Sequence, residues 1–328
     1  MSIRLTNRLL TLLLAIILVG GGGLYILYSQ APEAEKSLVV ATTTSLYDTG
    51  ILDRIEDAFE AKSSVDLYLI SVGTGLAITH AQRGDADMIL VHAPSKELQF
   101  MEEGYGVDRK IIAYNFFSIV GPSNDPVGIN NMNVEDALST LIEKGRSGEA
   151  IWVSRGDDSG THAKEKDLWS AAGYDATSLR DEDWYRESGT GMGKTLQIAE
   201  EFDAHTLTDM GTYLKYRKGA LINLEVVVGE GEKLINVYSA IAVSTESNTG
   251  ANFVGAIEFI EFLVSDEGQA IFESFGVDTY DTNLINPAVK LIKTGSDPDT
   301  VEWIEAAAYF EGSECPERFR SGDTKIYD

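Results

Sequence analysis

The sequence predicts an α/β protein of two lobes that are joined by two connecting strands. Strand patterns alternate with amphipathic helical patterns from residue 38 onward, which is typical of sheets with crossover helices. Two long apolar stretches, 110–121 and 234–243, bracket the middle third of the chain. We expect the first stretch to carry the chain into a second lobe and the second stretch to carry it back.

Hydrophobic periodicity places the individual elements. In lobe one we expect strands at 38–43, 65–72 and 88–92, helices at 51–62 and 75–82, and two helices within 251–276. In lobe two we expect a strand at 151–154 and helices at 133–145, 162–173, 195–204 and 207–219. Because helices separate successive strands, a parallel sheet is expected. Lobe one is then residues 38–120 plus 240–328, and lobe two is residues 121–239.

The charge balance limits the kinds of partner. The chain has 52 acidic and 26 basic residues, which gives a formal charge of -26. A surface this acidic repels nucleic acid and anionic membranes, so we expect no nucleic-acid partner. A site for a small anion would have to be local, built from backbone N–H groups, hydroxyls and at most one arginine. The acidity is otherwise interpreted as a source of solubility.

The cysteine and histidine content argues against a metal centre. The single cysteine, Cys315, can form no disulfide within the chain and no cysteine metal site. The four histidines, at positions 80, 92, 162 and 205, have no metal-ligand spacing. We therefore expect no metal and no other cofactor.

The N-terminus determines the expected compartment. Residues 1–8 are basic, residues 9–28 form an uncharged stretch long enough to span a membrane, and 29–37 form a polar linker. A cleaved signal peptide and an uncleaved signal anchor both fit. We favour the anchor because the apolar stretch has the length of a membrane span and because Pro32 follows the small-x-small pattern of Ser29 and Ala31. In both cases residues 38–328 lie outside the cytoplasmic membrane, since the basic residues precede the apolar run.

Two hydroxyl- and glycine-rich turns follow the first two strands. The run 42–45 (TTTS) can offer O–H and N–H donors at the carboxyl end of a strand, where α/β proteins bind ligands. The run 72–75 (VGTG) allows close approach of the backbone to a ligand. For 42–45 the alternative is structural, because β-branched residues end strands and Ser45 starts a turn. For 72–75 the alternative is an ordinary glycine turn, which is common.

A third motif combines a charge with a helix N-terminus. The run 154–162 (SRGDDSGTH) precedes a predicted helix, whose free N–H groups can bind an anion. Arg155 adds planar charged donors, and Asp157 could orient it. The alternative is that Asp158 or Ser159 simply caps the helix. A run at 205–213 around Thr208 and Asp209 could either cap a helix or close the cleft from lobe two.

These motifs together resemble the tungstate-binding component of tungstate ABC transporters. The matching runs are TTTS at 42–45, VGTG at 72–75, SRGDDSGTH at 154–162 and LTD-x-x-TY at 207–213. The resemblance implies the type II periplasmic binding protein fold, a tungstate or molybdate ligand, and an ABC permease with its ATPase as partners. It also implies a monomer. The ligand residues that it implies are Thr43, Thr44, Ser45, Thr74, Arg155, Ser159, Gly160 and Thr161.

Two features depart from the family pattern. Leu76 stands where relatives often have a polar residue, and the chain lacks the lipid-accepting cysteine of many relatives.

Three other functions remain as alternatives. A receptor for phosphate or sulfate is one of them, because Asp157 or Asp158 could accept a phosphate proton. An extracellular phosphatase-like hydrolase would need a nucleophile–base pair, for which Ser159 and His162 are weak candidates. A membrane-anchored sensor lacks a visible cytoplasmic output domain. We therefore expect a binding protein and no enzyme.

Overall fold

The computed structural model describes residues 36–229, 231–322 and 325–327 of the 328-residue chain. The predicted basic segment 1–8, the membrane segment 9–28 and most of the linker 29–37 lie outside the described residues. The chain divides into two units, 1–36 and 37–328, and the fold described below belongs to the second. Within the described ranges, no helix has both the length and the apolar character to cross a membrane.

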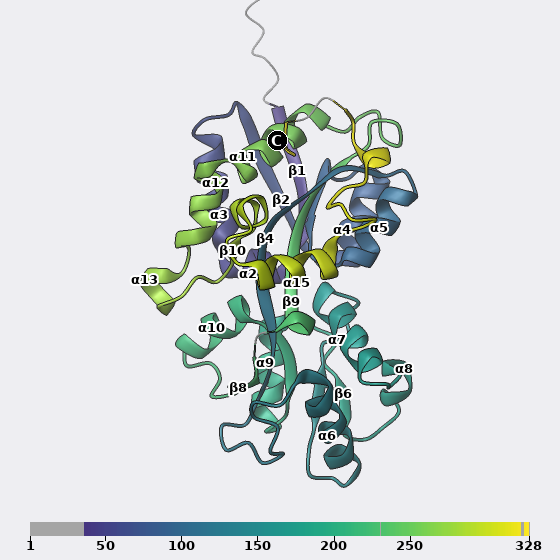
Figure 1. The fold of residues 1–328 in the computed structure, drawn as a ribbon, viewed down its shortest axis with the longest axis vertical. Coiled ribbons are helices and arrows are strands. Elements are labelled where there is room, and N and C mark those ends of the chain that lie inside the picture. Colours follow the sequence, from purple (N-terminus) through teal and green to yellow (C-terminus); the bar gives the residue numbers. More distant parts are fainter. Residues whose placement is uncertain (1–35, 230, 323–324, 328) are drawn as a thin grey trace, which may run out of the picture. The chain divides into compact units, whose positions relative to one another are not determined.

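Lobe one is built around a mixed sheet (Figure 1). Its strands, in spatial order, are β10 (Asn286–Pro287), β4 (Gly106–Gly121), β9 (Ile235–Val243), β3 (Met88–Val91), β1 (Lys36–Thr43) and β2 (Val65–Val72). β1 and β3 are parallel, as predicted, but β9 is antiparallel to both β3 and β4. The prediction of a parallel sheet was therefore wrong for this half of the sheet. β4 leaves the lobe and β9 returns to it, so the two strands must run in opposite directions.

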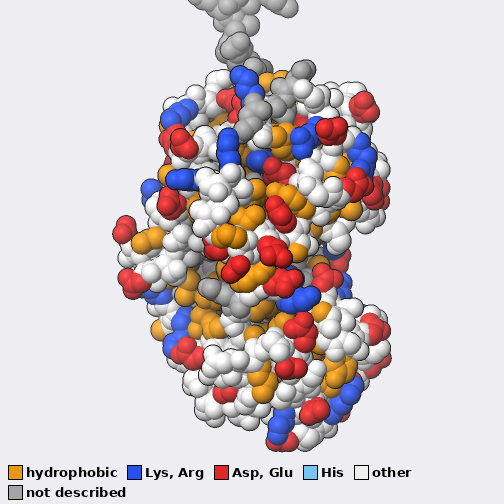
Figure 2. Space-filling view, in the orientation of Figure 1, with side chains coloured by type: hydrophobic (Ala, Val, Ile, Leu, Met, Phe, Trp, Pro, Cys, Tyr) orange, Lys and Arg blue, Asp and Glu red, His pale blue; other side chains and the backbone are white. Residues whose placement is uncertain are grey.

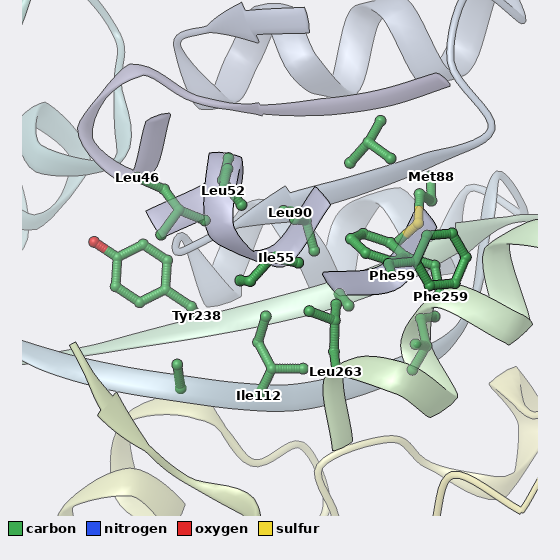
Figure 3. Packing of buried hydrophobic residues seen from close by; sticks show 14 of the residues in the cluster. Leu46, Leu52, Ile55, Phe59, Met88, Leu90, Ile112, Tyr238, Phe259 and Leu263 are labelled. Carbon is green, nitrogen blue, oxygen red and sulfur yellow. The ribbon is translucent and has the colours of Figure 1, made fainter. Parts of the chain in front are cut away.

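Helices cover both faces of this sheet. They are α2 (Thr44–Thr49), α3 (Ile51–Glu60), α4 (Thr74–Arg83), α5 (Pro94–Glu102), α11 (Phe253–Val264), α12 (Asp266–Ser274), α13 (Val277–Tyr280), α14 (Val289–Thr294), α15 (Pro298–Ala308) and the 3-10 turn η2 (Glu317–Phe319). α3, α11 and α12 pack on one face and α4 and α5 on the other (Figure 1). Figure 3 shows the first of these cores, where Phe59 of α3 meets Phe259 of α11 edge-on at 4.9 Å.

Lobe two is smaller and has shorter strands. They are β5 (Trp152–Ser154), β6 (Tyr185–Glu187), β7 (Thr206–Asp209) and β8 (Glu225–Val228). Its helices are α6 (Val134–Arg146), α7 (Gly160–Ala171), α8 (Ala176–Leu179), α9 (Met192–Glu201), α10 (Met210–Lys218) and the 3-10 turn η1 (Glu232–Leu234). Both β7 and β8 pair with the far end of β4. The helix predicted at 207–219 was wrong at its start, because residues 206–209 pair with β4 as a strand and the helix begins only at Met210.

The strands β4 and β9 are shared between the two lobes. Phe116 of β4 packs with the lobe-one residues, whereas Phe117 packs in the lobe-two core. On the returning chain, Leu234 belongs to the lobe-two core and Ile235 to a lobe-one cluster. We keep the division at 120/121 and 239/240 as a working proposal, with β4 and β9 as the connection between the lobes.

Candidate functional site

Four helices begin at one pocket between the lobes. The pocket has a volume of about 510 Å³ and is lined by Thr44, Gly73, Gly75, Leu76, Thr79, Arg155, Asp157, Asp158, Gly189, Thr190 and Gly191. These residues include or adjoin the N-termini of α2, α4, α7 and α9. The first turn of a helix has N–H groups without intrahelical partners and a partial positive charge. The backbone alone therefore makes this pocket favourable for an anion.

Arg155 is the cation of this pocket, and its side chain bridges the lobes. The side chain is 2% exposed. Its Nε donates to Asp157 Oδ2 at 2.9 Å, as the sequence suggested. Its Nη2 donates across the pocket to Thr44 Oγ1 at 2.9 Å, and its Nη1 lies 3.5 Å from Thr161 Oγ1. These contacts use three of the five guanidinium N–H groups, so two remain to bind a ligand.

The strand before Arg155 is anchored by a buried carboxylate. Glu165 on α7 is 2% exposed and accepts hydrogen bonds from Trp152 Nε1 at 2.8 Å, Ser154 Oγ at 2.9 Å and Tyr185 Oη at 2.6 Å. Because β5, β6 and α7 all meet at this one side chain, the end of β5 is fixed relative to the start of α7. Arg155 follows β5 directly and is thereby held at the N-terminus of α7.

The two acidic residues in the pocket wall are already engaged. Asp157 accepts from Arg155 Nε and, through its other oxygen, from the backbone N–H of Ser159 at 3.2 Å. Asp158 Oδ1 is 3.0 Å from Lys96 Nζ of lobe one and 3.6 Å from Lys166 Nζ. The carboxylates therefore contribute less negative potential to the pocket than free ones would.

The N-terminus of α7 is capped by a side chain. Ser159 is the N-cap, and its Oγ accepts from the backbone N–H of His162 at 3.2 Å. The capping alternative weighed from the sequence is thus confirmed for Ser159, and Asp158 is not the cap. A side-chain cap satisfies only one of the first-turn donors. The N–H groups of Gly160 and Thr161 have no intrahelical partner, and both residues are buried beside the pocket without being part of its lining.

The N-terminus of α4 has no side-chain cap. Gly73 is its N-cap residue, and a Cβ placed on Gly73 would lie 3.8 Å from the Cα of Ser159. The beginnings of α4 and α7 therefore face each other at close range. Thr74 is fully buried, and its Oγ1 has no hydrogen-bond partner within the described residues. A buried hydroxyl without a partner destabilises the unliganded protein. This is consistent with a hydroxyl that donates to a bound ligand.

The hydroxyls of the run 42–45 point in different directions. Thr43 caps α2 by accepting from Leu46 N at 3.4 Å, and its Oγ1 is 3.3 Å from Ser45 Oγ. Ser45 is fully buried, and its Oγ is 3.2 Å from Nε2 of His92. Of these three predicted ligand residues, Thr44 lines the pocket and meets Arg155, while the hydroxyls of Thr43 and Ser45 form contacts behind it.

Two functional elements were missed in the sequence. His92 follows β3, contacts Ser45 and lies against Gly160. Burial lowers its pKa to about 4, so the ring is neutral. The loop 189–191 (GTG) lines the pocket and begins α9. Its composition repeats that of the run 73–75, a signal that could have identified it, whereas a lone histidine after a strand gives no such signal.

The proposed catalytic pair of the hydrolase alternative does not form. The Oγ of Ser159 accepts from the backbone of His162, and the His162 ring accepts from Asp158 N at 3.0 Å through Nδ1. The ring therefore does not bind the hydroxyl that it would have to activate. Among the described residues, no group of three or more His, Cys, Asp or Glu side chains is placed to hold a metal ion.

Comparisons with known proteins identify the family of this chain. A family model described as a PBP superfamily domain matches residues 29–267. The tungstate-binding protein TupA of Peptoclostridium acidaminophilum is 34% identical over 86% of this chain and 98% of its own length. The structure of tungstate-binding protein TupA from Desulfovibrio alaskensis G20 is 36% identical, covers 77% of this chain and 98% of that chain, and has a TM-score of 0.66. The structure titled as the tungstate ABC transporter from Geobacter sulfurreducens is 40% identical, covers 74% and 100% of the two chains, and has the same TM-score.

Proposed function

This chain belongs to the PBP superfamily, and we propose that it is an extracytoplasmic receptor that captures tungstate between its lobes and delivers it to an ABC importer. Relatives named as tungstate-binding proteins support the ligand, since they match nearly their whole length at 34–36% identity. A family of solute-binding proteins also supports a binding role in preference to catalysis. Molybdate is the close alternative ligand, because it has the same charge and shape.

The observation that carries this proposal is the meeting of four helix N-termini around Arg155. Tungstate is a tetrahedral dianion without a proton near neutral pH, so it needs donors on all sides and no acceptor. The pocket offers the N–H groups of α4 and α7, the hydroxyl of Thr44 and the free N–H groups of Arg155. We propose that Thr44, Thr74, Arg155, Gly160 and Thr161 donate to the anion, with Thr44, Thr74 and Arg155 at the centre. The other predicted ligand residues, Thr43, Ser45 and Ser159, support these donors from behind the pocket.

The engagement of the acidic residues argues against phosphate. A protonated phosphate oxygen needs a carboxylate acceptor, and Asp157 and Asp158 were the candidates. Both oxygens of Asp157 accept hydrogen bonds from Arg155 and Ser159, and Asp158 pairs with Lys96. Sulfate has no proton to offer and is excluded only by size, since its bonds are shorter than those of tungstate. The ratio of tungstate to sulfate affinity therefore measures how strongly the pocket selects its ligand by size.

Closure of the lobes is the proposed capture step. Lobe-two side chains contact lobe one at several points, among them Arg155 at Thr44, Asp158 at Lys96, Lys215 at the backbone carbonyl of Asp48 and Lys218 at that of Thr279. In the working division of the lobes, β4 and β9 connect them. We propose that these two strands bend during closure, as connecting strands do in hinged binding proteins. Membrane anchoring through residues 9–28 and a monomeric state remain predictions.

Titration calorimetry on residues 37–328, stripped of ligand, tests the proposal. Tungstate, molybdate, sulfate and phosphate are titrated separately. We expect 1:1 binding of tungstate with a dissociation constant far below those of sulfate and phosphate. If sulfate or phosphate binds best, the oxyanion receptor stands but the ligand is wrong. If none of the four anions binds, the receptor proposal fails, and hydrolysis of phosphate esters becomes the next assay.

A further inference from the structure

The ring of His92 lies where the two lobes meet. His92 comes directly after β3, is 5% exposed and contacts Ser45 through Nε2 at 3.2 Å. The rings of Tyr238 and Phe117, on β9 and β4, lie 4.9 and 6.0 Å away between centroids. The imidazole is thus enclosed by the run 42–45 on one side and by the two connecting strands on the other.

The first residue of α7 packs directly on this ring. A Cβ on Gly160 would lie 2.5, 2.7 and 2.9 Å from Cε1, Nε2 and Nδ1 of His92. Real Cβ atoms essentially never come this close to other heavy atoms, so only glycine allows α7 to approach lobe one as it does here. Ser45, Tyr238 and Phe117 pack against other sides of the ring, so it cannot move in those directions without displacing them.

One neighbour of the ring, Asn236, belongs to a polar pair on the connecting strands. Asn115 of β4 and Asn236 of β9 lie opposite each other in the sheet. Asn236 Nδ2 donates to Asn115 Oδ1 at 2.7 Å and to Tyr238 Oη at 3.1 Å. His92, Asn236 and Gly160 also line one small cavity. His92 therefore lies next to the turn after β1, the start of α7 and the two connecting strands.

We propose that His92 is a positioning residue for anion capture. Its ring holds the Ser45 hydroxyl behind the run 42–45. The same ring is the surface against which Gly160 packs when the N-terminus of α7 approaches the anion. This inference rests on the proposed function, because it assigns His92 a part in closure around the same ligand. His92 does not contact the anion itself. Its effect is transmitted through Ser45 on one side and through the start of α7 on the other.

The test begins with Gly160→Ala, which adds one methyl group and keeps every backbone N–H. If the closed state becomes tenfold less accessible, the apparent dissociation constant for tungstate rises about tenfold. We expect a rise of at least that size, together with loss of the ligand-induced decrease in radius of gyration measured by X-ray scattering. Gly229→Ala is the matched control, since its Cβ would lie 3.6 Å from Val226 Cγ1 in ordinary contact.

A double-mutant cycle with His92→Ala makes the test specific. Removing the ring opens the space that the Gly160→Ala methyl group needs. In the His92→Ala background, Gly160→Ala should therefore change tungstate affinity by less than about threefold. Additive effects of the two substitutions, or unchanged binding and closure in Gly160→Ala, would overturn the inference.

Two further results keep the outcomes distinct. His92→Ala alone should weaken tungstate binding about tenfold through reduced closure, and unchanged affinity would count against the inference even if Gly160→Ala failed to fold. Failure of the proposed function shows in the wild-type protein, which would then bind none of the four anions. Failure of the present inference shows when the wild type binds tungstate and the variants either bind it as tightly as the wild type or have additive effects.

Discussion

The N-termini of α4 and α7 face each other across the pocket, yet their polar groups are satisfied to different degrees. At α7, the Ser159 hydroxyl caps the helix, and Asp157 holds both Arg155 and the N–H of Ser159. At α4, Gly73 offers no side-chain cap, and the buried Thr74 hydroxyl has no partner within the described residues. In lobe two, the groups at the start of α7 are therefore already held in place by internal hydrogen bonds. In lobe one, the Thr74 hydroxyl is free to donate to a ligand.

This difference indicates which interactions should affect stability and which should affect binding. Groups that are already paired in the free protein stabilise its fold, and removing them lowers the free energy of unfolding. An unpaired buried group destabilises the free protein and contributes only when a ligand arrives. The substitutions below separate the two kinds, in order of expected effect.

Arg155→Ala should have the largest effect on tungstate affinity. It removes the charged donors of the pocket and leaves the Asp157 carboxylate without its partner. Losing one member of a buried charge contact costs roughly 3 kcal/mol, which corresponds to about a 100-fold weaker dissociation constant. Calorimetry measures this change, and circular dichroism verifies that the variant is folded. Arg146→Ala, an exposed arginine of lobe two, is the control, and near-unchanged affinity of Arg155→Ala would contradict the site.

Thr74→Val should weaken binding and stabilise the free protein. The two side chains have similar shapes, so the substitution removes only a buried hydroxyl. A hydrogen bond to a charged group contributes roughly 1.5–3 kcal/mol, so the dissociation constant should rise at least about tenfold. Urea unfolding without ligand should show a free energy of unfolding higher by about 1 kcal/mol, because an unsatisfied group is gone. A fall in both stability and affinity would mean that Thr74 already has a partner in the free protein.

His205 of lobe two provides a pH-dependent test of the cost of unsatisfied groups. Neither ring nitrogen has a partner among the described residues, and burial lowers its pKa from 6.5 to about 4. Between these pH values the unfolded chain binds a proton that the folded protein cannot, so stability falls as pH falls. The contribution is at most about 1.4 kcal/mol per pH unit.

His205→Phe should therefore flatten the pH dependence without loss of stability at pH 7. Urea unfolding at pH 5, 6 and 7 measures the slope. His80→Phe serves as the comparison, because the His80 side chain is 34% exposed and contacts Asp85 at the surface. An equal slope in the wild type and His205→Phe would show that this histidine does not limit stability in acid.

Ser159→Ala should have the smallest effect, and mainly on stability. Loss of an N-cap side chain costs about 1 kcal/mol in the free energy of unfolding. Tungstate affinity should change less than about threefold, because the N–H groups of Gly160 and Thr161 remain. Thermal unfolding and calorimetry on the same sample provide both numbers. A large loss of affinity with little loss of stability would mean that the Ser159 hydroxyl binds the ligand. The N-termini of α4 and α7 would then not differ in how their hydroxyls are used.

Local patterns predicted the parts of the fold that depend on local interactions. The strand at 65–72 was predicted with the observed bounds, and the start of α7 lies within two residues of its prediction. The helix α2 was missed because its six residues follow β1 directly, where β-branched threonines favour a strand. The start of the run 207–219 was assigned to a helix because Thr208 and Asp209 look like caps, but pairing with β4 outweighs that preference.

The candidate site was predictable for a similar reason and to a similar extent. Arg155 and its partner Asp157 lie two residues apart, so the sequence alone could suggest their contact. The contact of Ser45 with His92 spans 47 residues, and that of Arg155 with Thr44 spans 111. No local pattern encodes such distances. The sequence therefore supplies the donors, while the fold determines which of them meet.

The acidic surface has a consequence for how fast the site fills. The chain has a formal charge of -26, and Figure 2 shows acidic side chains distributed over the visible face. A dianion approaching this surface is repelled at long range, although the donors inside the pocket attract it at contact. Dissolved salt screens the long-range repulsion within about 10 Å at 0.1 M and within about 3 Å at 1 M. We therefore expect association to accelerate as ionic strength rises. Receptors whose surface charge steers the ligand inward show the reverse behaviour.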